Sequence, residues 1–277
     1  MKRARGRGNG LVERALRYDR LLVIAGVLAV IVLSWTYLLA GAGTMQEMDG
    51  MLMPMSSGPW TPGHAIVMLL MWTVMMAAMM LPSAASMILF YAAIARGRDT
   101  SGMPTARSGI FAAGYVAIWT AFSLAAVALQ YGMERLALLS PMMETTSKTL
   151  AGGILIAAGL YQWSPLKKTC LQSCRSPLEF VLSHWRSGAR GAFVMGVLHG
   201  VYCVGCCWML MLLLFVGGIM NLGWIAGLAI LVLAEKLVPA GYWIGRGAGV
   251  LLIGWGIATL LYAGATGPGM LALPFHL

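Results

Sequence analysis

Residues 199–208 read HGVYCVGCCW and place one imidazole and three thiols close together in an apolar segment. Residues three and four apart share one face of a helix, so His199, Cys203, and then Cys206 or Cys207 line up as a column. Thiolate and imidazole suit Zn²⁺, and they suit Cu(I) when thioethers join them. The run therefore predicts a metal site or a redox site, and the alternative is that these small side chains simply pack.

Methionine supplies a second pattern, because 13 of the 22 methionines lie between residues 45 and 103. Thioether is a soft, uncharged ligand that selects Cu(I), although a methionine stripe is also a common core filler. Together with the Cys/His column, these methionines suggest a graded path for Cu(I). It runs from an outer methionine-rich segment through the methionine rows to the column. The outer segment holds Met45, Met48, Met51, Met53 and Met55, one row holds Met68, Met71, Met75 and Met79, and the adjacent row holds Met76 and Met80.

The segment 165–190 carries Cys170 and Cys174 four residues apart, beside several basic residues. Two interpretations remain open for this pair. The first is a cytoplasmic acceptor for the same metal, with thiolates favoured by the nearby positive charges. The second is two ordinary reduced thiols. Apolar residues farther along, at 180, 181 and 185, predict a short amphipathic helix on the membrane surface.

The composition excludes an ordinary soluble domain. The chain has 277 residues, of which 60% are hydrophobic and 10% charged, and its mean hydropathy is +0.80; soluble domains carry about 25% charged residues. We expect an all-α, polytopic transmembrane helix bundle in one domain over residues 21–265, with a basic arm at 1–20 and a short tail at 266–277. With about 20 apolar residues per span as the template, six to seven spans are predicted at 21–40, 64–95, 108–131, 149–164, 191–216, 219–235 and 247–265.

The net charge of +10 is distributed unevenly between the loops. Of the 19 Lys and Arg residues, 17 fall on one side of the predicted spans, and Arg135 and Lys148 fall on the other. The positive-inside rule therefore predicts a cytoplasmic N-terminus and an external C-terminus. The basic arm is expected to determine the topology or to contact anionic lipid, and no nucleic-acid partner is expected.

Two residues within the spans carry specific expectations. Pro82 should kink the span 64–95, because proline removes a backbone donor. Glu235 is the last residue of the predicted span 219–235. We expect it to form a helix-end ion pair with Lys236 or Arg246.

Four motifs in order resemble the bacterial integral membrane family called predicted metal-binding membrane proteins (domain of unknown function 2182): MMAAMMLPSAASM (75–87), YQWSPLKKTCLQSCRSP (161–177), HGVYCVGCCWMLM (199–211) and VGGIMNLGWIAGLAILVLAEKL (216–237). The resemblance covers residues 64–240. It implies a polytopic protein of the bacterial inner membrane that binds metal. The ligands that it implies are Met75, Met76, Met79, Met80, Cys170, Cys174, His199, Cys203, Cys206 and Cys207.

The leading hypothesis is a non-enzymatic membrane protein that binds copper as Cu(I), with zinc as the alternative metal. It would move the metal across the bilayer or deliver it to a membrane or periplasmic partner. A second hypothesis is a membrane thiol–disulfide oxidoreductase that uses the Cys203-x-x-Cys206 pair. A third is a structural or assembly subunit whose cysteines only pack. The sequence leaves the oligomeric state open.

Overall fold

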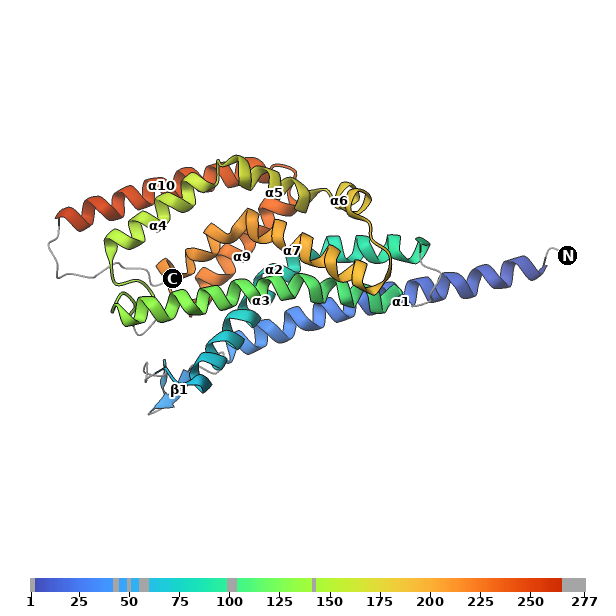
Figure 1. The fold of residues 1–277 in the computed structure, drawn as a ribbon, viewed down its shortest axis with the longest axis horizontal. Helices are drawn as coiled ribbons and strands as arrows, with labels where there is room; N and C mark the ends of the chain where they lie inside the picture. The colour runs from blue at the N-terminus through green and yellow to red at the C-terminus, as the bar shows by residue number, and fades with distance from the viewer. Residues whose placement is uncertain are drawn as a thin grey trace.

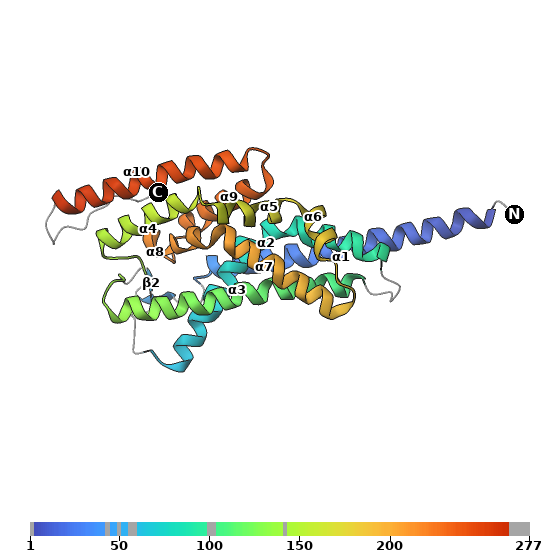
Figure 2. The same ribbon diagram turned by 45° about the horizontal axis from the view of Figure 1, so that its top comes forward.

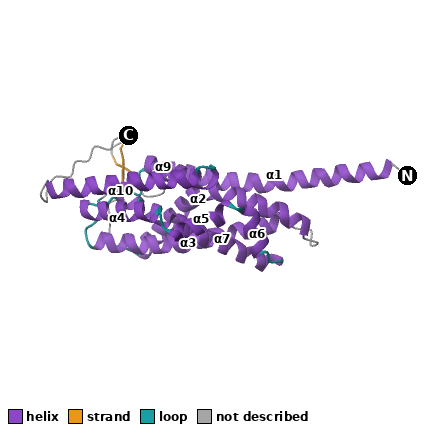
Figure 3. Ribbon diagram, turned by 90° about the horizontal axis from the view of Figure 1, so that it is seen from above, coloured by secondary structure: helices purple, strands orange, loops and turns teal. Residues whose placement is uncertain are grey.

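The computed structural model describes residues 3–41, 45–48, 51–54, 60–98, 104–140 and 143–265. These residues form helices joined by short connections, plus one two-stranded hairpin (Figures 1 and 3). The all-α fold class is confirmed in outline, and the hairpin is an addition to it. The elements are α1 (Arg3–Leu39), β1 (Met45–Met48), β2 (Met51–Pro54), α2 (Pro62–Arg98), α3 (Pro104–Arg135), α4 (Lys148–Tyr161), α5 (Pro165–Arg175), α6 (Pro177–His184), α7 (Gly188–Leu212), α8 (Leu214–Gly217), α9 (Leu222–Leu237) and α10 (Gly241–Ala265).

The two ends of the chain and the methionine-rich segment are only partly described. The basic arm is continuous with the first predicted span in α1, whose N-terminal part projects past the other helices (Figure 1). The methionine-rich segment forms an antiparallel hairpin that pairs Met45 with Pro54 and Met48 with Met51. Met55 and the tail 266–277 lie outside the described residues.

Five helical stretches in the described residues are long and apolar enough to cross a membrane, namely Leu21–Leu39, Pro62–Gly97, Ala106–Arg135, Gly188–Gly217 and Gly241–Gly264. The predicted spans 149–164 and 219–235 form α4 and α9, which have 14 and 16 residues. At a rise of 1.5 Å per residue these helices are about 21 and 24 Å long, against a hydrocarbon core of about 30 Å. By length and composition, five helices of the described residues are therefore long enough to cross a membrane, and α4 and α9 are shorter than such a span.

Local capping signals explain why α4 and α9 are short. The helix α4 begins at a Ser147 cap, and the next helix, α5, starts at once with Ser164 as its cap and Pro165 in its first turn. The helix α9 begins where the Asn221 side chain accepts a hydrogen bond from the Trp224 amide. It ends before Pro239, and a residue that precedes proline avoids the helical conformation.

The methionine rows lie on α2, which is helical through Pro82. The two halves of α2 run in different directions in Figures 1 and 2, as expected of a helix kinked at a proline. The six methionines from Met68 to Met80 are each at most 1% exposed. These side chains therefore face the bundle interior and are available to a site built there.

The helices α3 and α7 approach each other closely because glycines line their contact. A Cβ at Gly196 would clash with the backbone carbonyl of Phe111, and one at Gly114 would clash with the carbonyl of Phe193. Since only glycine fits at such a crossing, the two backbones touch there. This contact fixes the face of α7 that carries residues 199–207 against α3.

We expect Gly196→Ala to lower the thermal stability of the protein in detergent. The added methyl group must push α3 from α7, and overpacking of this kind costs about 1–3 kcal/mol. Gly254→Ala is the matched control, because a Cβ at Gly254 meets nothing within 4 Å and alanine favours helices. Equal melting temperatures for the two variants would contradict the close crossing.

Candidate metal centre

The three cysteines of α7 share one face of the helix and are buried. Cys203, Cys206 and Cys207 are at most 1% exposed, and all three thiols are free. The sulfurs of Cys206 and Cys207 lie 3.1 and 2.9 Å from the Cys203 carbonyl oxygen, to which both thiols donate. The predicted column is therefore present and faces the protein interior.

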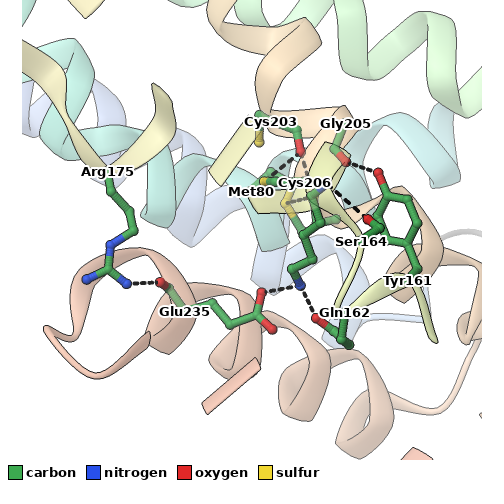
Figure 4. Close-up of polar contacts among 11 residues, drawn as sticks. Met80, Tyr161, Gln162, Ser164, Arg175, Cys203, Gly205, Cys206 and Glu235 are labelled. Atoms are coloured by element: carbon green, nitrogen blue, oxygen red, sulfur yellow. Dashed lines mark hydrogen bonds and ion pairs between the residues drawn. The ribbon is translucent and has the colours of Figure 1, made fainter. Parts of the chain in front are cut away.

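The cysteines of α5 join this cluster from a second helix. The thiol of Cys174 interacts with those of Cys203 and Cys206. The sulfur of Cys170 sits over Gly205, where a Cβ would lie only 2.7 Å from it. The missing side chain at Gly205 thus lets α5 dock on α7. Figure 4 shows the neighbouring hydrogen bond from the Tyr161 hydroxyl to the Gly205 carbonyl oxygen.

The cytoplasmic acceptor suggested for Cys170 and Cys174 stays a prediction, and the structure adds that both side chains are buried. Cys170 and Cys174 are 8% and 7% exposed, so neither presents an open thiol to solvent. Burial raises the pKa of the Cys170 thiol, and the neighbouring Cys206 raises it further. The basic neighbours therefore do not produce a reactive thiolate at Cys170. The short helix predicted nearby is confirmed as α6, and Phe180 and Val181 on it are buried.

One methionine of α2 contacts the cysteine cluster directly. The sulfur of Cys207 lies 3.8 Å from the sulfur of Met80, which brings α2 and α7 together at this point. Met75, Met76 and Met79 are buried on the same helix. The contact between the methionine row and the cysteine column, which the mixed-ligand hypothesis requires, is thus present at Met80.

Lys236 and Tyr115 complete the surroundings of Cys203, and no sequence pattern indicated either contact. The Lys236 ammonium lies 2.9 Å from the Cys203 sulfur and 3.0 Å from the Ser83 hydroxyl. The Tyr115 hydroxyl lies 3.0 Å from the same sulfur and 3.2 Å from the Met80 carbonyl oxygen. The cation directed at this buried sulfur favours negative charge on it.

The expected ion pair of Glu235 with Lys236 or Arg246 is wrong. Glu235 pairs instead with Lys167 of α5 at 2.6 Å, and both side chains are nearly inaccessible. Successive helical residues point about 100° apart, so Glu235 and its neighbour Lys236 face different sides of α9. Lys167 also donates to the Gln162 side chain, and the Arg175 guanidinium donates to the Glu235 backbone carbonyl oxygen (Figure 4).

His199 lies one helical turn before Cys203 and is 2% exposed. Its ring stacks on Tyr115, with centroids 5.6 Å apart. Among the described residues its Nδ1 has no hydrogen-bond partner, which is unusual for a buried polar atom. The ring is thus beside the thiol cluster and retains an uncommitted nitrogen.

The donors that meet here are soft. Thiols from two helices, a thioether from a third and an adjacent imidazole match the preferences of Cu(I). Within the described residues, no three His, Cys, Asp or Glu side chains are arranged to hold one ion. The Met80–Cys207 contact adds a thioether donor that zinc seldom uses.

The fold and this cluster define a helical protein whose interior presents soft sulfur ligands, which is the chemistry of copper handling. Residues 69–259 match the model of the PpoB2 family, described as a copper chaperone, and the chain belongs to this family. Neither a curated protein nor a solved structure matches the chain. The match confirms the expectation of a copper-related family, and it does not favour the thiol–disulfide oxidoreductase alternative.

We expect Glu235→Ala to destabilise the protein by about 3–5 kcal/mol, because it leaves the buried Lys167 ammonium without its counter-charge. The double variant Glu235→Ala with Lys167→Met should be the more stable of the two, since it removes both charges. Thermal unfolding in detergent measures the difference. A double variant less stable than Glu235→Ala alone would contradict the pairing.

Proposed function

We propose that this chain is a multi-pass membrane protein that binds Cu(I) in its interior and delivers it to a partner. The observation that carries the proposal is the meeting of three helices at one soft site: Cys203, Cys206 and Cys207 from α7, Cys174 from α5 and Met80 from α2. The copper chaperone family supports the identity of the metal. The five long apolar helices support placement in a membrane.

The site suits a carrier better than a catalyst. Cu(I) bound by a few thiolates and a thioether exchanges between ligands without any change in its oxidation state. The metal enters and leaves as Cu(I), so no electron donor or acceptor is needed. His199 offers a further donor one turn along α7, and we assign it to the path by which the ion leaves or reaches the sulfurs. The charge distribution of the loops favours a cytoplasmic N-terminus in a bacterial inner membrane, with a membrane or periplasmic protein as the recipient.

Lys236 has a specific electrostatic task in this proposal. A Cu(I) ion held by two thiolates carries a net charge of −1, which is costly in an apolar interior. The Lys236 ammonium, 2.9 Å from the Cys203 sulfur, makes the whole centre neutral. At a separation of about 4 Å and an effective dielectric constant near 20, such a charge contributes about 4 kcal/mol. The lysine therefore selects a monovalent ion over a divalent one.

The proposal is tested by anaerobic loading of the purified, reduced protein with Cu(I) or Zn²⁺, followed by elemental analysis. The variant with Cys203, Cys206 and Cys207 all changed to Ser should lose tightly bound copper. Cys170→Ser is the matched control, because the Cys170 sulfur packs against Gly205, and it should retain that copper. Unchanged copper in the triple variant would overturn the proposal, and binding of zinc in preference to copper would overturn the choice of metal.

Lys236→Met is expected to weaken Cu(I) affinity at least about tenfold, a loss of about 1.4 kcal/mol, because the bound centre then carries an uncompensated charge. Lys236→Arg keeps the positive charge and should recover part of the affinity. Competition with a chromophoric Cu(I) chelator measures both dissociation constants. Wild-type affinity in Lys236→Met would show that the ammonium has no such role.

A further inference from the structure

A second group of sulfurs surrounds a buried amide at the opposite end of the α2 methionine row. Gln130 of α3 is fully buried. Its Nε2 atom lies 3.6 Å from the sulfur of Met68 and 3.7 Å from the sulfur of Met143. The same nitrogen donates to the Glu134 carboxylate at 2.8 Å. Three acceptors from three segments of the chain thus converge on one nitrogen atom.

The acceptors here exceed the available hydrogens. A glutamine NH₂ group has two N–H donors, and the Glu134 oxygen takes one in a short, charge-assisted bond. The two thioether sulfurs share what remains. The other side of the amide is held in place, since Gln130 Oε1 accepts a hydrogen bond from the Trp72 indole at 2.8 Å. The Gln130 N–H groups are therefore too few to satisfy all three acceptors. The sulfur lone pairs of Met68 and Met143 can also accept a positive ion.

Met143 is held at this cluster by a strained backbone. Its φ of +57° lies in the left-handed region, which methionine seldom adopts. Two backbone hydrogen bonds accompany this conformation: the Met143 amide donates to the Ser140 carbonyl oxygen, and the Met143 carbonyl oxygen accepts from the Ile219 amide. Its side chain is half-buried, whereas Met68 is 1% exposed. One sulfur thus lies near the surface and the other lies within the bundle.

We propose that Met68 and Met143 form a second Cu(I) site, which receives the ion before it reaches the buried cysteine cluster. This inference rests on the proposed function, in which Cu(I) is the cargo. In the bound state each sulfur donates a lone pair to Cu(I), while the Gln130 amide keeps its hydrogen bonds with Trp72 and Glu134. The Glu134 carboxylate, held by Gln130 and by the Trp60 indole, balances the single positive charge. No electron moves in this step.

The position of this site fits a relay. The hairpin of β1 and β2, with its methionines, immediately precedes α2 and lies at the same end of the molecule as the end of α3 (Figure 1). Twelve residues separate Met68 from Met80, which is about 18 Å along a helix. Between them lie the buried methionines Met71, Met75, Met76 and Met79. A thioether site binds Cu(I) less tightly than thiolates do, so the ion would move inward to stronger ligands.

The test is an anaerobic Cu(I) titration of the full-length protein against a competing chelator. Wild type should bind two ions of different affinity. Met68→Leu with Met143→Leu should lose only the weaker ion, and the triple Cys-to-Ser variant should lose only the tighter one. Met87→Leu with Met195→Leu removes two other buried methionines and should still bind both ions.

Each alternative result has a distinct meaning. One ion in wild type, lost in the triple Ser variant and kept in Met68→Leu with Met143→Leu, would overturn the second site and leave the proposed function standing. No tight copper in wild type would overturn both. If the double Leu variant fails to fold, Met143→Leu alone decides, because that side chain is half-buried in a turn. Retention of both ions in Met143→Leu would overturn the second site.

Discussion

The contact between the Lys236 ammonium and the Cys203 sulfur is the interaction on which the site depends. An isolated charge in an apolar bundle is costly, so each group requires the other. Their separation of 2.9 Å demands that α9 and α7 stay in register. Ser83 of α2 accepts a hydrogen bond from the same ammonium, which ties a third helix to the pair. The chemistry of the centre and the packing of the bundle are thus set by one contact.

The helix α9 is held in that register from its other side. The ion pair of Glu235 with Lys167 attaches α9 to α5. The Arg175 guanidinium also donates hydrogen bonds to backbone carbonyl oxygens at the C-terminal end of α9. Since Glu235 and Lys236 are neighbours in the chain, one helical segment connects two buried polar clusters. A change at the α5 contact is therefore expected to alter the position of the Lys236 charge at Cys203, although the two clusters share no side chain.

The sequence predicted the parts of this account that depend on local pattern. Helical spacing placed the α7 cysteines on one face, hydropathy located the long helices, and the methionine row proved to be buried. It did not predict the contact of Lys236 with Cys203 or the ion pair of Lys167 with Glu235. These contacts join residues that are 33 and 68 positions apart in the chain. The predicted spans 149–164 and 219–235 came close to the lengths of α4 and α9, which the caps at Ser147 and Asn221 delimit at their N-terminal ends. No sequence pattern indicated Met143 or Gln130. Their contact forms only when distant parts of the chain fold together.

We infer that Cu(I) is bound by sulfur donors from more than one helix, with Met80 among them. The decisive measurement is X-ray absorption at the copper edge of the Cu(I)-loaded protein, with wild type compared with Met80→Leu in samples carrying one tightly bound ion. We expect a first shell made of sulfur in wild type and a shell with fewer sulfur scatterers in the variant. A shell dominated by nitrogen or oxygen, or spectra that do not differ between the two proteins, would contradict it.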